Sequence, residues 1–389
     1  MNYLKLSKLD LKNKRVLIRE DLNVPIKNGK ISDDTRIRAA LPTIQYALEK
    51  GAAIILMSHL GRPSEGIVDP QFSLAPIAEK LSELLLHPVR FISDWINGFD
   101  IQPGEIVLCE NTRFLPGEKK CDDALSQKMA QLCDVFVMDA FATAHRAESS
   151  TSGVAKFAKI ACAGFLLDAE LTALSKAFKN PEKPVIAIVG GSKISTKMSV
   201  LEALLDKVDT LIVGGGIANT FLSAKNIAIG NSLVEKEWIN AAKKLLEKAA
   251  LKNVSIPLPI DVAVAKSFSA TEKATIKSVD DIQADDMILD VGPKTAASYA
   301  AIMKHAKTIV WNGPVGVFEF PAFSAGTKAL ADAIAHSDAF SIAGGGDTLS
   351  AIMQFHIEDK ISYLSTGGGA FLEFMEGKQL PGVDALYAR

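Results

Sequence analysis

The 389-residue sequence has few cysteines, no excess of positive charge and no long apolar run. Its four cysteines form no CxxC pair and no cluster with histidine, which indicates reduced thiols rather than a disulfide framework or a zinc site. Lys and Arg number 43 against 45 Asp and Glu, so no broad basic face is available for nucleic acid. No stretch matches a membrane span or an apolar signal segment. We therefore expect a cytoplasmic protein without membrane or nucleic-acid partners.

Several nucleotide and catalytic motifs are also missing. The stretch PVIAIVGGSKISTKM (184–198) suggests a phosphate loop, yet it lacks the glycine and the Lys-Ser/Thr pair of a Walker sequence. The glycine-rich segments at 214–216, 344–346 and 367–369 do not complete GxGxxG, which argues against a nicotinamide-dependent dehydrogenase. No HExxH zinc motif, GxSxG elbow or protein-kinase catalytic loop is present.

What the chain does contain is an alternation of short Val/Ile-rich runs with longer helical patterns, which predicts α/β architecture with parallel sheets. A chain of this length is too long for one ordinary core, so we expect two domains. An amphipathic helix over 168–180 marks the junction between them, and a second helix is predicted over 33–51. The predicted strands are residues 15–18, 52–57, 105–109, 134–138, 185–189, 210–213, 308–311, 339–343 and 361–364.

Charged and polar side chains follow the predicted strands of the first half. Ligands of such sheets lie beyond the carboxyl ends of the strands, so these side chains should converge. Guanidinium groups grip phosphate and carboxylate with paired hydrogen bonds, which favours a small anionic ligand. Taken singly, each arginine could instead be solvated and His59 structural. The side chains are Arg19, Asp21, Asn23, Arg36, Arg38, His59, Arg62, Arg113, Asp139, His145 and Arg146.

Glycines follow the predicted strands of the second half, at 190–191, 214–216, 313, 344–346 and 367–369. Glycine lets the backbone approach a ligand, and free N–H groups at a helix start favour phosphate. We therefore expect a nucleotide here, with Lys193 and Lys197 on one face of the first turn of the helix that follows. Asp347 either caps a helix or holds Mg²⁺.

Seven strings in order along the chain resemble the phosphoglycerate kinase family, in its bacterial form. They are SHLGRP, DAFATAHR, VGGSKISTK, VGGGIANTF, WNGPVGVFE, AGGGDT and STGGGAFLE, and the match extends from about Arg19 to Glu373. The resemblance implies two Rossmann-like, doubly wound parallel-sheet domains joined by a helix and a hinge. It assigns residues 1–167 and 370–389 to a 3-phosphoglycerate-binding domain and residues 168–369 to a nucleotide-binding domain.

The resemblance also implies the reaction and its residues: reversible, in-line phosphoryl transfer between ATP and 3-phosphoglycerate in glycolysis, on domain closure, by a monomer. The implied substrate-binding residues are Asp21, Leu22, Asn23, Arg36, His59, Leu60, Gly61, Arg62, Arg113 and Arg146. The implied catalytic residues are Arg36, Lys193, Lys197, Gly368 and Gly369. Nucleotide binding falls to Lys197, Asn312, Glu319, Gly345, Gly346, Asp347 and Thr348, with Asp347 also holding Mg²⁺ beside the phosphates of ATP or ADP.

Three residues depart from the family pattern. Glu20 replaces a small or apolar residue and adds negative charge beside the acid site, with its side chain expected to face away from Arg19 and Asp21. Ala142 replaces a common glycine, which would cost on the order of 1 kcal/mol if the position needs positive φ. Phe165 replaces a common proline near the junction helix. A non-catalytic nucleotide or anion sensor on the same fold remains an alternative, which would bind ATP without turnover.

Overall fold

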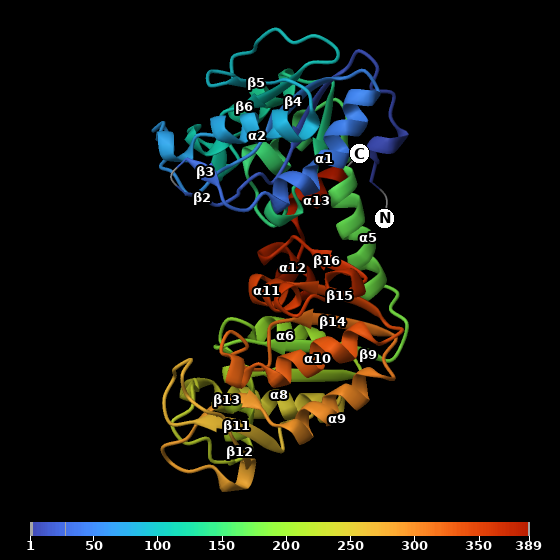
Figure 1. The fold of residues 1–389 in the computed structure, drawn as a ribbon. Coiled ribbons are helices and arrows are strands. Elements are labelled where there is room, and N and C mark those ends of the chain that lie inside the picture. Colours follow the sequence, from blue (N-terminus) through green and yellow to red (C-terminus); the bar gives the residue numbers. More distant parts are fainter. Residues whose placement is uncertain (1–2, 28, 388–389) are drawn as a thin grey trace. The chain divides into compact units, whose positions relative to one another are not determined.

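The computed structural model describes residues 3–27 and 29–387. Contacts divide the chain into two compact units, a first unit of Met1–Thr172 with Gln379–Arg389 and a second unit of Ala173–Lys378. The division falls inside helix α5 (Phe165–Phe178), near the predicted junction helix. The division differs from the bounds that the resemblance implies: residues 168–172 fall in the first unit and residues 370–378 in the second. Figure 1 shows the elements of both units.

The first unit is built on a six-stranded parallel sheet with the order β5-β6-β4-β1-β7-β8. All four strands predicted in this half are present. The short β5 and β8 were not predicted, and β5 is only partly buried, which leaves it without a continuous apolar run. The bounds are β1 (Arg15–Arg19), β4 (Ala53–Met57), β5 (Val89–Ile92), β6 (Ile106–Cys109), β7 (Val135–Met138) and β8 (Ala161–Ala163).

Helices of the first unit pack an apolar face on this sheet. In α1 (Thr35–Glu49) the buried residues Ile37, Ala40, Ile44 and Ala47 recur at helical spacing and join the core of the unit. The other helices are α2 (Ala75–Leu85), α3 (Asp123–Gln131), α4 (Val154–Phe157) and α13 (Pro381–Tyr387). The short elements are β2 (Ile26–Lys27), β3 (Lys30–Ile31), η1 (Leu6–Lys8), η2 (Pro70–Phe72), η3 (Thr112–Phe114), η4 (Glu118–Lys120), η5 (Phe141–Thr143) and the π-helical turn η6 (Ser149–Gly153).

The second unit contains a five-stranded parallel sheet with the order β10-β9-β14-β15-β16. All five strands predicted in this half are present, so the parallel α/β fold class is confirmed for both units. The chain winds outward in one direction from β9 and in the other from β14, which makes the β9/β14 boundary the switch point of the sheet. The bounds are β9 (Val185–Gly190), β10 (Thr210–Gly214), β14 (Thr308–Asn312), β15 (Phe340–Gly344) and β16 (Tyr363–Ser365).

A second, antiparallel sheet with the order β12-β11-β13 lies at one end of this unit, as Figure 1 shows, and was not predicted. Its strands are β11 (Asp261–Ala265), β12 (Thr275–Ser278) and β13 (Met287–Val291). The helices are α6 (Met198–Leu204), α7 (Gly215–Ala224), α8 (Ile239–Leu251), α9 (Pro293–Met303), α10 (Ala325–Ala335), α11 (Gly346–Gln354) and α12 (Gly369–Met375). Short turns are η7 (Lys236–Trp238), η8 (Val279–Asp281), η9 (Pro321–Phe323) and η10 (Glu358–Lys360).

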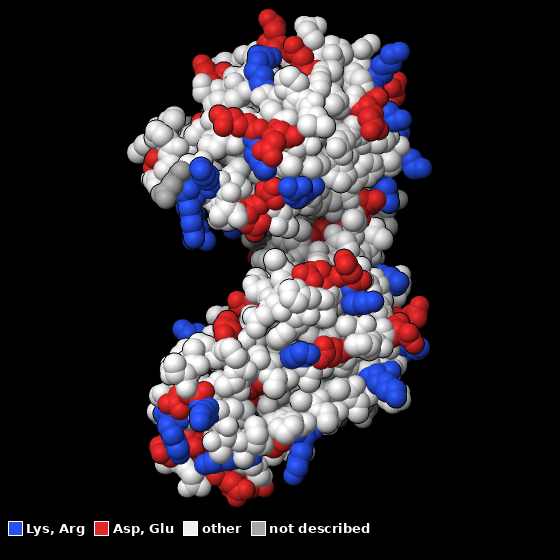
Figure 2. Space-filling view, in the orientation of Figure 1, with Lys and Arg blue, Asp and Glu red and all other residues white. Residues whose placement is uncertain are grey.

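None of the helices in 3–27 and 29–387 combines the length and the apolar composition that crossing a membrane requires. Over the same residues, no three His, Cys, Asp or Glu side chains are grouped so that they could hold a metal ion. In the view of Figure 2, basic and acidic side chains are interspersed over each unit, in keeping with the near-neutral composition.

Candidate functional site

The carboxyl ends of the strands in the first unit gather a group of cations around His59. The charges of Arg19, Arg113, Arg146 and Arg36 all act on the His59 ring. These side chains come from the end of β1, from α1, from η3 after β6 and from the segment after β7. The predicted convergence of arginines from separate strand ends is therefore present within one unit.

Hydrogen bonds fix the loops that carry this group. Arg36 Nη1 lies 3.0 Å from Asp21 Oδ2 and donates to the carbonyl of Asn23 at 2.9 Å. Asn23 Oδ1 in turn accepts from the backbone N–H of Gly61 at 2.9 Å, which ties the loop after β1 to the loop after β4. A cavity of about 430 Å³ opens beside Arg36 and Asn23. These residues leave room for a small ligand.

Arg113 is buried and spans two partners. It donates to the carbonyl of Gly61 at 2.7 Å and to Glu148 Oε1 at 3.2 Å. Arg146 also approaches Glu148, at 4.0 Å. Burial lowers the pKa of Arg113, an effect opposed by Glu148. Glu148 was not predicted; it follows Arg146 by two residues, and that closeness was the available signal.

The His59 imidazole is neutral in this environment. Burial, followed by the charge of Arg19, holds its pKa well below the usual value. Arg19 Nη2 lies 3.3 Å from Nδ1, and because a guanidinium group can only donate, Nδ1 is the acceptor. The ring proton is therefore on Nε2, where it can be donated to an anion.

Three other predicted residues of this group play different parts. Leu22 and Leu60 are buried, and the structure engages their backbones: Ser58 Oγ accepts from the Leu22 N–H, and Asn111 Nδ2 donates to the Leu60 carbonyl. Arg62 is exposed, in contrast to the buried Arg19 and Arg113.

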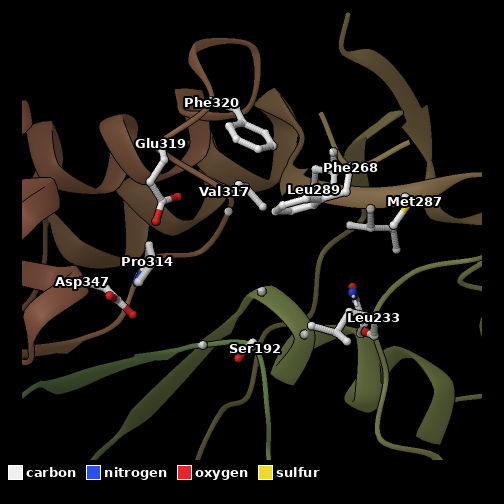
Figure 3. Close-up of a pocket in the computed structure, with 16 residues that line it drawn as sticks. Ser192, Leu233, Phe268, Met287, Leu289, Pro314, Val317, Glu319, Phe320 and Asp347 are labelled. Carbon is white, nitrogen blue, oxygen red and sulfur yellow. Dashed lines mark hydrogen bonds between the residues drawn. The ribbon is translucent and has the colours of Figure 1, made fainter. Parts of the chain in front are cut away.

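The second unit holds a cavity of about 610 Å³ at the carboxyl ends of β9, β10 and β14 (Figure 3). One side is formed by the glycine-rich turns around Gly191, Ser192 and Gly216. The opposite side is apolar, and its labelled side chains gather on one flank in Figure 3. That apolar flank consists of Phe268, Met287, Leu289, Val317 and Phe320, whereas Leu233 lies beside Gly216.

Two glycines, Gly190 and Gly313, allow close backbone contact between the turns that follow β9 and β14 at the switch point. A Cβ on Gly190 would lie 1.8 Å from the carbonyl oxygen of Pro314, and one on Gly313 would lie 2.2 Å from that of Gly190. Gly313 also has φ of +104°, which side chains rarely adopt. The glycines predicted at these strand ends thus have a steric reason, and they bring bare backbone to the edge of the cavity.

Polar residues at the other end of the cavity include two predicted ones. Glu319 and Asp347 line it, and both carboxylates are visible in Figure 3. Lys197 Nζ donates to Asn312 Oδ1, while Asn312 Nδ2 donates to the Gly344 carbonyl at 2.6 Å. Burial lowers the pKa of Lys197, and Asp347 opposes that effect. The structure thereby links Lys197, Asn312 and Asp347.

The expected placement of the two lysines in a helical turn is wrong. Lys193 and Lys197 both lie in the loop between β9 and α6, which begins only at Met198. The backbone turns there, with the Lys197 N–H donating to the Ile194 carbonyl at 2.9 Å. Lys193 is exposed and Lys197 half-buried. Phosphate-loop spacing therefore misled the prediction of where the helix starts.

The start of α11 contains the remaining predicted nucleotide residues. Gly345, with φ of +101°, precedes the helix and Gly346 begins it. The Thr348 hydroxyl accepts from the Gly313 N–H at 2.7 Å and donates to the Gly344 carbonyl at 3.0 Å. Its hydroxyl therefore braces β14 against β15, and only its backbone N–H is left to meet phosphate. Gly368, with φ of +44°, and Gly369 lie at the start of α12, outside the lining of the cavity.

The structure locates the three residues that depart from the family pattern. Glu20 is fully buried, and burial followed by repulsion from Asp139 raises its pKa well above the usual value, which disfavours the negative charge expected beside the acid site. Ala142 lies in η5 and is not among the residues with positive φ, so the replaced glycine costs no strain. Phe165 packs edge-on against Tyr46, with ring centroids 5.0 Å apart.

Sequence and structure comparisons agree on one family. A family model described as phosphoglycerate kinase matches residues 6–378. The chain is similar to the phosphoglycerate kinase of Francisella philomiragia, with 61% identity over 386 residues, covering 99% of this chain and 98% of the relative. The chain belongs to the phosphoglycerate kinase family.

Solved structures agree with this assignment. A phosphoglycerate kinase structure from Coxiella burnetii matches with a TM-score of 0.96 and 59% identity, over 99% of this chain and 98% of that one. A phosphoglycerate kinase structure from Pyrococcus horikoshii matches with a TM-score of 0.82 and 33% identity, over 98% of both chains. The resemblance inferred from seven short strings is therefore confirmed over the whole fold.

Proposed function

We propose that this chain catalyses reversible transfer of a phosphoryl group between ATP and the carboxylate of 3-phosphoglycerate, yielding ADP and 1,3-bisphosphoglycerate, as its family membership indicates. The observation that carries the proposal is the cluster of four arginines around a neutral His59. An acid with a phosphate and a carboxylate supplies the negative charge that such a cluster needs. We assign this acid to the first unit.

We assign the nucleotide to the cavity of the second unit. Its apolar flank suits a base, and exposed Glu319 can accept from ribose hydroxyls. The free N–H groups at the start of α11, from Gly346 to Thr348, suit phosphate oxygens. Lys197, Lys193, Arg36 and the N–H groups of Gly368 and Gly369 are the groups we propose to neutralise charge on the phosphoryl group in transfer.

Mg²⁺ is expected with the nucleotide, and the described residues can supply one protein ligand for it. They offer no cluster of three protein ligands, but Asp347 supplies a single carboxylate at the cavity edge. One carboxylate with phosphate oxygens and water is the usual set for this ion. Bound there, Mg²⁺ would offset the charge of the nucleotide phosphates.

The proposed step needs no covalent enzyme intermediate. A carboxylate oxygen of 3-phosphoglycerate forms a bond to the γ-phosphorus of ATP, and the bond from that phosphorus to the β–γ bridging oxygen breaks, releasing ADP. The carboxylate is already ionised, so the protein needs no general base. Its work is in-line positioning and charge stabilisation. With one ligand on each unit, we infer that a monomer closes about α5 to bring them together and exclude water.

The test is formation of an acyl phosphate from ATP, Mg²⁺ and 3-phosphoglycerate, trapped as the hydroxamate with hydroxylamine. We expect turnover that depends on all three reactants. Glycerate without its phosphate is the control substrate, and it should react poorly because it lacks one anionic group. A folded protein that binds ATP without forming acyl phosphate would instead be a non-catalytic sensor.

A further inference from the structure

We propose that Glu118 is a positioning residue for the acid-binding side chains, holding Arg19 and His59 in place through the Ser150 hydroxyl. This inference rests on the proposed binding of 3-phosphoglycerate at the His59 cluster. Glu118 lies in η4, Ser150 in η6 and Arg19 at the end of β1, so three separate elements form the chain. All three side chains are fully buried.

Glu118 accepts two hydrogen bonds from Ser150. Its Oε2 accepts from the backbone N–H of Ser150 at 3.0 Å, and its Oε1 accepts from the Ser150 hydroxyl. Both carboxylate oxygens therefore already face donors, which favours the ionised form. A proton on the carboxyl group would weaken these two hydrogen bonds, because it removes the negative charge that strengthens them.

The Ser150 hydroxyl can donate only one hydrogen bond, and its neighbours determine which group accepts it. Arg19 Nε lies 2.9 Å from Ser150 Oγ and can only donate, so Oγ accepts there and gives its own proton to Glu118. Arg19 Nη1 donates to the Glu20 carbonyl, and Nη2 donates to His59 Nδ1. Three of the guanidinium N–H groups thus have fixed partners, and the last of them sets the tautomer of His59.

The pKa of Glu118 lies near neutrality because burial outweighs its hydrogen bonds and the charge of Arg19. Burial raises its pKa to about 7, while Ser150 and Arg19 lower it and Glu148 raises it. On its own turn, Lys119 Nζ donates to the Pro63 carbonyl and Lys120 is exposed. Asp122 caps α3 through the Leu125 N–H. The positive charge that lowers the pKa of Glu118 is therefore that of Arg19, which is linked to Glu118 through the Ser150 hydroxyl.

The variant Glu118→Gln removes the charge and one of the two acceptors while keeping the shape. At about pH 8.5 we expect the KM for 3-phosphoglycerate to rise about tenfold, with the KM for ATP unchanged, since a hydrogen bond to a charged group is lost. As the pH falls through about 7, wild-type Glu118 takes up a proton and the wild type approaches the variant. The ratio of the two KM values should therefore fall toward one near about pH 5.5.

The titration of the ligand affects both proteins equally, so it cancels in this ratio. A ratio above one indicates loss of positioning, whereas a ratio below one indicates simple loss of charge. Simple removal of a negative charge would strengthen anion binding and lower the KM, which would overturn the proposal. A ratio above one that does not vary with pH would also overturn it, because it would indicate only a structural defect.

A matched control is Asp290→Asn in the second unit. Asp290 is a buried carboxyl, and burial raises its pKa also to about 7. It should leave the KM for 3-phosphoglycerate unchanged.

A second variant covers the case in which Glu118→Gln does not fold. Ser150→Ala keeps the carboxylate but removes the hydroxyl between Glu118 and Arg19, and it should also raise the KM for 3-phosphoglycerate several-fold. A KM equal to that of the wild type would overturn the proposal. Turnover by the wild type distinguishes the proposed function from the proposed role of Glu118. If the wild type forms no acyl phosphate, the proposed function is refuted. If it turns over and both variants have an unaltered KM, only the role of Glu118 is refuted.

Discussion

The two units of this protein prepare for anions in opposite ways. The first unit uses side chains, with four arginines and a neutral histidine brought together from separate strand ends. The second unit uses backbone, with glycine turns packed so closely that no side chain fits between them. In the first unit the positive charge is shared among several arginines. In the second unit it is supplied by the half-buried Lys197, which is linked to Asn312.

The difference follows from the ligands we propose. A three-carbon acid has little apolar surface, so binding must come from charge, and guanidinium groups supply it in fixed directions. A nucleotide brings an apolar base, which the flank of the larger cavity can bury, and its phosphates can be met by N–H groups at a helix start. The same α/β framework thus supports two kinds of site, because the loops after the strands differ.

The largest effect should come from removing Lys197, the half-buried lysine that is linked to Asn312. We expect Lys197→Ala to lower kcat by about 10²- to 10³-fold, the usual effect of losing one group that stabilises transition-state charge. The measurement is steady-state formation of the trapped acyl phosphate. Lys193→Ala is the matched control, and its effect should be smaller because Lys193 is exposed. An equal loss in both variants would contradict the contrast between one critical cation and several shared ones.

The next effect tests a single cation of the first unit. We expect Arg113→Ala to raise the KM for 3-phosphoglycerate by about 10- to 100-fold, since it removes charged hydrogen bonds and leaves Glu148 with one fewer partner. The KM for ATP should not change. Arg113→Lys should restore little of the affinity, because a lysine cannot span both the Gly61 carbonyl and Glu148. Full rescue by lysine would show that charge alone matters there.

Backbone packing in the second unit offers a third test. Gly313→Ala places a Cβ against the Gly190 carbonyl at a strained φ, so we expect a loss of about 1–3 kcal/mol in the free energy of unfolding and weaker ATP binding. Urea unfolding and ATP titration measure the two. Gly346→Ala is the control for stability, since a Cβ there has no atom within 4 Å. A stable Gly313→Ala protein with unchanged ATP affinity would remove the steric reason for glycine at the switch point.

Much of this contrast was predictable from the sequence. Continuous runs such as residues 185–189 predicted buried parallel strands, and residues that follow such strands must meet at one edge of the sheet. Arg36, His59 and Arg113 could therefore be grouped without coordinates. Glycine after a strand similarly predicted close backbone approach at Gly190 and Gly313.

What escaped prediction depends on contacts between distant segments. The apolar flank of the cavity includes Met287 and Leu289 of β13, in an antiparallel sheet whose partner strand β12 is largely exposed and carries no clear apolar pattern. The burial of Arg19 against Ser150 could not be predicted, because it is set by pairing across 131 positions. Glu118 carried no local signal at all. Such roles come from tertiary packing, which periodicity cannot reveal.

The smallest expected effect concerns Asp290, which holds the wall of the cavity in the second unit. Its carboxyl accepts from the Val291 N–H at 2.9 Å and the Gly326 N–H at 2.7 Å, beside Gly316 of the lining. Asparagine can accept on one side only, so we expect Asp290→Asn to raise the KM for ATP a few-fold, about the effect of one lost hydrogen bond. Steady-state kinetics at varied ATP measure this.

The pH dependence of stability gives Asp290→Asn a second readout. Burial raises the pKa of Asp290 to about 7 in the folded protein, whereas an unfolded aspartate titrates near about 4. The folded state therefore binds more protons between these values, and the stability contributed by Asp290 is full below about pH 4 and lost as the pH rises through about 7. The wild type should lose its advantage over Asp290→Asn across that interval in urea unfolding. A difference in unfolding free energy that stays constant from about pH 4 to 7 would mean that Asp290 is ionised throughout, with its two N–H donors outweighing its burial.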